Sequence, residues 1–272
     1  MSDTPRSGEP AQIAVLAYGP LPQQFGELRL PAGPGPHPAL VMVHGGFWRA
    51  RYGLDYFGDI CEALAAAGVA TWNIEYRRLG DPGGGWPGTL LDVAAAVDHT
   101  RTLAARYPLD LARTGALGHS AGGHLALWAA GRARIHAASP LRAEDPLRLR
   151  CAVALAGVSD LRRAWELRLS NNVTEEFLGG TPTEVPERYA AASPAELLPL
   201  GVTQLLLHGT EDDSVPYDMS MRYLAAAGAA GDGATLMTLA GKGHFEMVDP
   251  ATAAWRTVLA LTLRRLGVGA GA

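Results

Sequence analysis

Hydrophobic residues along this chain follow two alternating patterns. Short runs rich in Val, Leu, Ile and aromatic residues, bounded by Gly or Pro, alternate with longer Ala-rich stretches that have helical spacing. The short runs predict strands near residues 12–18, 25–31, 39–45, 69–76, 113–119, 151–157, 203–209 and 234–240. The longer stretches predict helices near residues 55–67, 89–106, 121–131, 217–228 and 250–266.

The character of the runs predicts how the strands pair. The first two show polar and apolar alternation and are joined by a short linker, which suits an antiparallel edge. The later runs are almost continuously apolar, as expected for parallel strands that are covered on both faces. In the helix near 89–106, Leu90, Val93, Val97 and Leu103 fall on one face, and Asp92 is expected to point elsewhere. We therefore predict an α/β fold, a mostly parallel eight-stranded sheet with helices on both faces.

One interval departs from this alternation of predicted strands and helices. The stretch at about 158–202 is far longer than a simple crossover needs and contains three short helical pieces, in "DLRRAWELRLS", "TEEFLGG" and "VPERYAAASPAELLP". We expect a small helical, cap-like insertion over one end of the sheet, so that residues 1–272 form a single domain.

Composition and charge narrow the classes of partner. The chain is 48% hydrophobic and 18% charged, which is ordinary for a globular protein with a sizeable core. Its net charge of −4 gives no reason to expect nucleic acid or a membrane as a partner, whereas a small neutral molecule suits it well.

The polar start "MSDTPRSGEPAQ" and the lack of long apolar runs favour a cytoplasmic protein. Cys61 and Cys151 are expected to be buried free thiols. A homo-oligomer is left open.

The motif "GHSAGG" carries the first candidate for chemistry. Ser120 lies between Gly118 and Gly122, at the junction of a predicted strand and a predicted helix. Such a motif can be an ordinary glycine-rich turn, but the strand-to-helix context is what a nucleophilic serine requires. In so tight a turn a Cβ on either glycine would collide with the neighbouring elements. The hydroxyl would then be exposed beside a helix N-terminus that favours developing negative charge.

A serine needs a general base and an orienting acid, and two later segments can supply them. "LLLHGTEDDSVP" is a strand followed by a loop with Asp212 and Asp213, and "LAGKGHFEMVDP" is a strand followed by a loop with His244. Both loops follow the carboxyl end of a strand, as Ser120 does, so the three side chains are expected at the same edge of the sheet.

A fourth segment, "VMVHGGFWRA", follows the third predicted strand. Its residues Gly45 and Gly46 allow the backbone to approach a substrate oxygen closely, as an oxyanion loop must. The nearby histidines do not have the spacing of metal ligands, so no metal or cofactor is expected. His44 and His208, at strand ends, are expected to hold loops by hydrogen bonds.

Taken together, these segments resemble the α/β-hydrolase superfamily, in its carboxylesterase and kynurenine-formamidase-like branch. The resemblance covers nearly the whole chain and includes "HGGFW", "EYRRLG" followed by "GWPGTLLDV", "GHSAGGHL", "HGTEDDSVP" and "GKGHF". It implies a three-layer fold in which Ser120 is the nucleophile, His244 the base and Asp212 the acid, with Asp213 as the alternate. It also implies an oxyanion hole made by the backbone N–H groups of Gly46, Phe47 and Ala121. Aromatic residues near these loops are candidates for substrate contact, namely Trp48, Tyr52 and Trp86.

The resemblance implies a serine hydrolase that cleaves small carboxylic esters through an acyl-enzyme. An arylformamidase acting on N-formylkynurenine is the main alternative, because "HGGFW" and "GHSAGGHL" are similar to that family as well. A peptidase is allowed by "HGTEDDSVP" alone. The fold can also serve as a ligand-binding protein without catalysis, although such proteins usually lack the nucleophile or the base.

Overall fold

The computed structural model describes residues 13–269 and contains one eight-stranded sheet, with strand order β1-β2-β4-β3-β5-β6-β7-β8. Its strands are β1 (Ile13–Ala17), β2 (Phe25–Arg29), β3 (His37–Val43), β4 (Ala70–Ile74), β5 (Leu109–His119), β6 (Cys151–Leu155), β7 (Thr203–Gly209) and β8 (Ala234–Leu239). Strand β2 runs antiparallel to β1 and β4, and all other pairs are parallel. The predicted strands and the antiparallel edge are confirmed, except that residue 12 lies outside the described residues.

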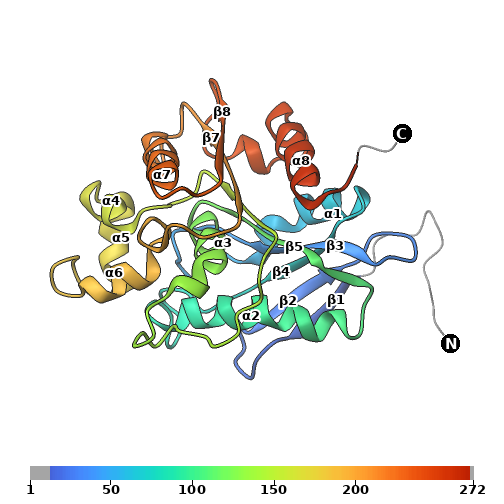
Figure 1. The fold of residues 1–272 in the computed structure, drawn as a ribbon, viewed down its shortest axis with the longest axis horizontal. Coiled ribbons are helices and arrows are strands. Elements are labelled where there is room, and N and C mark those ends of the chain that lie inside the picture. The colour runs from blue at the N-terminus through green and yellow to red at the C-terminus, as the bar shows by residue number, and fades with distance from the viewer. Residues whose placement is uncertain (1–12, 270–272) are drawn as a thin grey trace.

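Helices cover both faces of this sheet (Figure 1). They are α1 (Gly58–Ala66), α2 (Gly88–Ala104), α3 (Ala121–Gly131), α7 (Asp218–Ala229) and α8 (Ala253–Leu266). Side chains of α2, α3 and α7 belong to one hydrophobic cluster, and those of α1 and α8 belong to a second. The protein is therefore a three-layer α/β structure, as predicted. None of the helices within residues 13–269 combines the length and the apolar character that spanning a bilayer requires.

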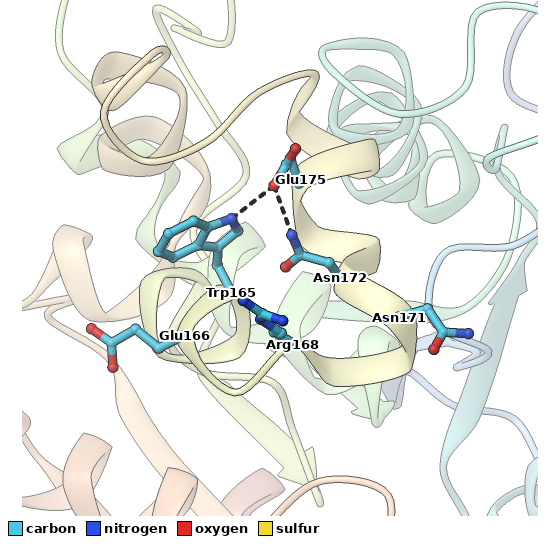
Figure 2. Close-up of a pocket in the computed structure, with 6 residues that line it drawn as sticks. All are labelled: Trp165, Glu166, Arg168, Asn171, Asn172 and Glu175. Atoms are coloured by element: carbon cyan, nitrogen blue, oxygen red, sulfur yellow. Dashed lines mark hydrogen bonds between the residues drawn. The ribbon is translucent and has the colours of Figure 1, made fainter.

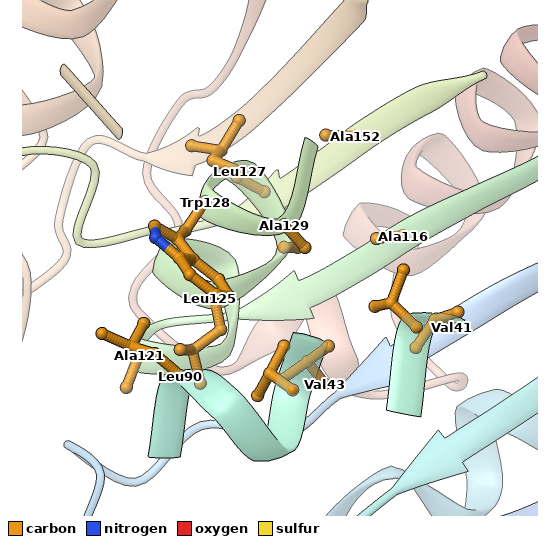
Figure 3. Close-up of a cluster of buried hydrophobic side chains, with 14 of the residues drawn as sticks. Val41, Val43, Leu90, Ala116, Ala121, Leu125, Leu127, Trp128, Ala129 and Ala152 are labelled. Carbon is orange, nitrogen blue, oxygen red and sulfur yellow. The ribbon is translucent and has the colours of Figure 1, made fainter. Parts of the chain in front are cut away.

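The alternation of side chains along β3 explains why two cores form. All of β3 is buried, with Val41 and Val43 in the first cluster and Leu40 and Met42 in the second. Figure 3 draws part of the first cluster, in which the valines lie with Leu90 of α2 and with Leu125 and Trp128 of α3. Since burying one such side chain contributes about 1.5–3 kcal/mol, a central strand buried on both faces fixes the sheet firmly.

The expectation that Asp92 of α2 points away from the buried face was wrong. The predicted inner face of the helix is buried as expected, but Asp92 is also buried, with only 1% of its surface exposed. The carboxylate is satisfied there by the guanidinium of Arg77, with Nε 2.8 Å from Oδ2 and Nη2 2.7 Å from Oδ1. Gln24 Nε2 donates a further bond of 2.7 Å. A bidentate partner from another segment allows a carboxylate to be buried, which the helical pattern alone does not reveal.

The insertion between β6 and β7 contains α4 (Leu161–Glu166), α5 (Leu169–Leu178), α6 (Pro186–Ala192) and the 3₁₀ helix η3 (Pro194–Leu197). Figure 1 shows these elements grouped at one side of the molecule, near α3. Two buried side chains of α3 donate to backbone carbonyls of α6: Trp128 Nε1 to Ala191 at 2.9 Å and His124 Nε2 to Ala192 at 2.9 Å. The insertion is thus attached directly to the helix that follows Ser120.

Candidate active site

Ser120 occupies the sharp turn between β5 and α3. Its φ and ψ angles are 58° and −122°, a backbone conformation that residues other than glycine rarely adopt. The turn is held by a hydrogen bond from Ser120 N–H to the Leu155 carbonyl at 2.8 Å and by one from His124 N–H to the Ser120 carbonyl at 3.1 Å. Such strain persists only where surrounding structure enforces it, and here β6 and α3 do so.

The two glycines of the motif are required by close backbone contacts. A Cβ on Gly118 would lie 2.0 Å from the carbonyl oxygen of Gly122, and a Cβ on Gly122 would lie 1.9 Å from that of Val43. Both distances are far shorter than any van der Waals contact. The small residues around Ser120 therefore allow β3, β5 and α3 to approach closely enough to form the turn.

His244 and Asp212 form the second part of the site. His244 Nδ1 lies 2.6 Å from Asp212 Oδ2, which joins the loop after β8 to the loop after β7. The other oxygen of Asp212 accepts the backbone N–H groups of Ser214 at 2.9 Å and Val215 at 2.8 Å. Asp213, by contrast, is exposed, and its carboxylate accepts a bond of 3.1 Å from the Ser214 hydroxyl. The structure thus brings Asp212, and not its neighbour, to the histidine.

The surroundings of Asp212 keep its carboxylate ionised. Burial raises the pKa of this carboxyl, but hydrogen bonds from His208 and His244 and the charge of His244 lower it by more, so that the pKa lies well below its usual range. His208 Nε2 is 3.2 Å from the same oxygen that His244 contacts. A fixed carboxylate that accepts the Nδ1 proton of His244 leaves Nε2 free to act as a base.

Ser120 and His244 line the same cavity, which has a volume of about 210 Å³. Within the described residues, neither Ser120 Oγ nor His244 Nε2 has a recorded hydrogen-bond partner, so both remain free to engage a substrate. Aromatic side chains make up much of the wall, together with Arg51, Ser170 and Ser214; they are Phe47, Tyr52, Tyr56 and Phe245. The insertion contributes Ser170, so it forms part of the cavity.

The three aromatic residues considered for substrate contact have different positions. Tyr52 lines the cavity and is 41% exposed. Trp48 is buried away from it, stacked on Phe177 with ring centroids 4.4 Å apart. Trp86 is half-buried and packs against the core, with Arg188 5.8 Å above its ring. Trp48 and Trp86 therefore hold the insertion and the core together and do not line the cavity.

The loop after β3, which carries two of the predicted oxyanion donors, has an unusual backbone. Gly46, Phe47 and Trp48 have φ angles of 106°, 50° and 57°, and Arg49 N–H closes the turn on the Gly46 carbonyl at 3.0 Å. In the part of the chain that the structure describes, the N–H groups of Gly46, Phe47 and Ala121 have no recorded acceptor. Free donors beside a nucleophile suit an oxyanion.

The start of the loop after β3 is anchored by buried hydrogen bonds. His44 Nε2 lies 2.9 Å from Glu75 Oε1, and the same carboxylate accepts the backbone N–H groups of Leu54 and Tyr76 at 3.2 and 2.9 Å. At the other side of the site, His208 contacts the carbonyl of Val215 at 2.9 Å. Both histidines hold loops by hydrogen bonds, as the sequence suggested. Within residues 13–269 no group of three or more His, Cys, Asp or Glu side chains is arranged to hold a metal ion.

Tyr56 and His119 also belong to the site, although no sequence motif assigns them a role there. Tyr56 Oη lies 2.7 Å from His119 Nδ1, and His119 Nε2 lies 2.8 Å from the backbone carbonyl of His244. Burial, followed by the nearby charge of His244, lowers the pKa of His119 to about 3. His119 is therefore neutral at physiological pH and carries its proton on Nε2, which donates to the carbonyl. The position of His119 next to the predicted nucleophile was the one available signal, and Tyr56 had none.

A second cavity, of about 730 Å³, lies in the insertion (Figure 2). It is lined by Trp165, Glu166, Arg168, Asn171, Asn172 and Glu175. Figure 2 shows Glu175 accepting bonds from Trp165 Nε1 at 2.9 Å and from Asn172 Nδ2 at 2.6 Å. Although this cavity is larger, its lining holds no nucleophile and base together. The chemistry of the lining residues, and not the volume, therefore identifies the smaller cavity as the candidate active site.

The chain is similar to one known family and to several curated proteins. The sequence model of the family described as BD-FAE matches residues 28–226. One curated relative is the probable isoprenylcysteine alpha-carbonyl methylesterase ICME of Oryza sativa subsp. japonica, 26% identical over 86% of this chain and 58% of the relative. Another is esterase LipC of Mycobacterium tuberculosis, 28% identical over 79% of this chain and 55% of the relative. The chain thus spans little more than half the length of these relatives.

Solved structures share the fold at low sequence identity. A truncated form of a carbohydrate esterase from gut microbiota has a TM-score of 0.79 and 22% identity, covering 97% of this chain and all of that one. The butyrate-bound esterase Est2 of Thermogutta terrifontis has a TM-score of 0.77 and 23% identity, covering 96% of each chain. The three-layer α/β-hydrolase fold expected from the sequence is therefore confirmed.

Proposed function

The chain belongs to the BD-FAE family, and on that premise we propose that it is a serine carboxylesterase that cleaves small carboxylic esters through an acyl-enzyme on Ser120. One observation carries the proposal. A serine in a strained strand-to-helix turn and a histidine held by a buried carboxylate line one small cavity. A nucleophile, a base and an orienting acid in that arrangement are the requirements of acyl transfer.

In the first half of the reaction, His244 Nε2 removes the proton of Ser120 while Oγ attacks the ester carbonyl. The tetrahedral oxyanion accepts hydrogen bonds from the N–H groups of Gly46, Phe47 and Ala121. The Asp212 carboxylate stabilises the imidazolium that forms on His244. His244 then gives the proton to the leaving alcohol, which breaks the C–O bond and leaves the acyl group on Ser120.

In the second half, water takes the place of the alcohol. His244 removes a proton from the water as it attacks the acyl-enzyme, a second oxyanion forms in the same position, and the proton returns to Ser120 Oγ as the acid leaves. The volume of about 210 Å³ favours short acyl groups. Est2 of Thermogutta terrifontis, which shares the fold, has been solved with propionate and with butyrate bound.

The test is a set of initial rates and pre-steady-state bursts with the 4-nitrophenyl esters of acetate, butyrate and octanoate, beside N-formylkynurenine. We expect turnover of acetate and butyrate, weaker turnover of octanoate, and a loss of at least about 10³-fold in Ser120→Ala, because removing the nucleophile removes the acyl-enzyme route. A higher kcat/KM for the formamide would establish the arylformamidase alternative. Hydrolysis that survives in Ser120→Ala, or no turnover of any substrate, would refute the proposal.

A further inference from the structure

The lining of the catalytic cavity is unbalanced in charge. Among the residues that line it, Arg51 is the one Lys, Arg, Asp or Glu side chain, and the others are aromatic, histidine, serine or glycine. Arg51 lies in the turn that follows the oxyanion loop, between Arg49 and Tyr52. A permanent positive charge therefore lies at the wall of the cavity that holds Ser120.

Within residues 13–269, Arg51 has no acidic partner of its own. Its neighbours in this region are paired: Arg49 contacts Glu176 at 3.1 Å, and Arg78 contacts Glu75 at 3.1 Å. For Arg51, the described residues contain no carboxylate within 4.0 Å and no recorded hydrogen bond from the guanidinium. Its five N–H donors are thus available for a ligand.

This charge is on an exposed side chain that is supported by one neighbouring ring. The guanidinium carbon of Arg51 lies 4.8 Å from the centre of the Tyr52 ring, within the range of a cation–π contact. The carbonyl of Tyr52 accepts a hydrogen bond from Arg78 Nη1, and the N–H of Tyr52 donates to Arg49 at 3.2 Å. The turn that carries Arg51 is thus tied to Arg78, and the Tyr52 ring supports the guanidinium beside the cavity that Arg51 lines.

We propose that Arg51 forms an anion subsite of the catalytic cavity and that the enzyme prefers esters which themselves carry a carboxylate near the scissile bond. This inference rests on the proposed esterase function and names its substrate class. A small cavity brings an anionic group of the same molecule within reach of the guanidinium, which can bind a carboxylate by two parallel hydrogen bonds. Esters with a positive charge are disfavoured for the same reason.

The test compares two matched pairs of substrates. The first pair carries the charge on the acyl side, mono-4-nitrophenyl glutarate against 4-nitrophenyl valerate. The second carries it on the alcohol side, 4-acetoxybenzoate against the neutral 4-acetoxybenzamide. In at least one pair we expect the anionic member to have a kcat/KM about fivefold higher, the effect of a favourable exposed ion pair. The preference should shrink when salt is raised from about 0.01 M to about 1 M, because the Debye length falls from about 30 to about 3 Å.

Two variants assign the preference to Arg51. Arg51→Gln should remove it and Arg51→Glu should reverse it. Arg106→Gln is the matched control, because Arg106 also stacks on a tyrosine, 5.8 Å from the Tyr107 ring, but does not line the cavity. The ratio of kcat/KM between the anionic and the neutral substrate should be the same in this control as in the wild type. A ratio that is near one in both pairs, or that survives in Arg51→Gln, would overturn the subsite. Failure of every ester, neutral ones included, would instead overturn the proposed function and with it this inference.

Discussion

The Nε2 atom of His119 lies 2.8 Å from the backbone carbonyl oxygen of His244, so the residue before the proposed nucleophile directly supports the residue that is proposed as the base. The two rings are 4.4 Å apart between centroids. His119 is in turn held by the Tyr56 hydroxyl, which donates to its Nδ1. This connection fixes the loop after β8 relative to the turn at Ser120.

Removing the hydroxyl of Tyr56 is expected to loosen this support. Tyr56→Phe loses one neutral hydrogen bond, a contribution of about 1 kcal/mol, so kcat should fall about fivefold. Because the effect is on the position of His244, KM for a short ester should change by less than about twofold. Steady-state kinetics with 4-nitrophenyl butyrate would measure both values.

Tyr189→Phe is the control for this variant. Its hydroxyl also donates one hydrogen bond, to the Gly180 carbonyl at 3.2 Å, but within the insertion and away from the proposed catalytic cavity. This control should lose stability without losing kcat. Equal losses of kcat in the two variants would mean that Tyr56 is merely structural.

Asp212→Asn should reduce kcat by about 10³- to 10⁴-fold while the fold is kept. The amide oxygen can still accept the N–H groups of Ser214 and Val215, which hold the loop. The amide NH₂, however, would face His244 Nδ1 and leave the imidazole in the wrong tautomer. Circular dichroism would check the fold, and kcat/KM the activity.

Asp213→Asn provides the matched comparison one residue away. Since its carboxylate is exposed and contacts Ser214, activity should stay within about twofold of the wild type. A larger loss in Asp213→Asn than in Asp212→Asn would contradict the assignment of the acid.

Two glycine-to-alanine substitutions should have opposite effects on the free energy of unfolding. Gly122→Ala would bring a Cβ to 1.9 Å from the Val43 carbonyl, between β3 and α3, where the backbone cannot move aside. We expect a loss of at least about 3 kcal/mol, or failure to fold. Gly228→Ala, in α7, meets nothing within 4 Å and should gain about 0.5–1 kcal/mol. Urea denaturation would measure both, and a tolerated Gly122→Ala would show that the turn can relax.

The sheet and the order of the segments that carry the candidate site were predictable because they depend on local patterns. An almost continuously apolar run such as β6 can be satisfied only by burial on both faces, and a glycine-flanked serine after such a run predicts a tight turn. Since parallel strands align their carboxyl ends, the loops that carry Asp212 and His244 could be expected at the same edge before any contact was known.

Side-chain directions in the loops were not predictable. Trp48 turns into the core because it follows Phe47 in a turn where both residues have positive φ angles, 57° and 50°. The left-handed stretch of Ser170, Asn171 and Asn172, with φ angles of 46°, 58° and 62°, lies between two of the predicted helical pieces, and nothing in the sequence indicated these angles. Such conformations depend on contacts with distant segments, for instance the bond from Arg49 Nη2 to the Ser170 carbonyl at 3.2 Å.

Stability should fall on mild acidification because of two buried histidines. Burial lowers the pKa of His119 to about 3 and that of His124 to about 4, whereas both have values near 6.5 in the unfolded chain. Between those values the unfolded state binds more protons than the folded state, so the free energy of unfolding rises with pH from about 4 to 6.5 and levels off above it. Each histidine contributes a slope of about 1.4 kcal/mol per pH unit.

This slope can be assigned by removing one of the two titrating groups. His124 joins α3 to the insertion through the Ala192 carbonyl, at 2.9 Å, and accepts from Trp48 Nε1 at 3.2 Å. A glutamine offers a donor and an acceptor but no titratable group. His124→Gln should therefore lower the slope of the unfolding free energy between pH 4 and 6 by about 1.4 kcal/mol per pH unit, the contribution of one histidine, even if the variant is less stable overall. Urea denaturation at half-unit pH steps gives the slope. A profile of the same slope in both proteins would show that His124 does not stay neutral in the folded state.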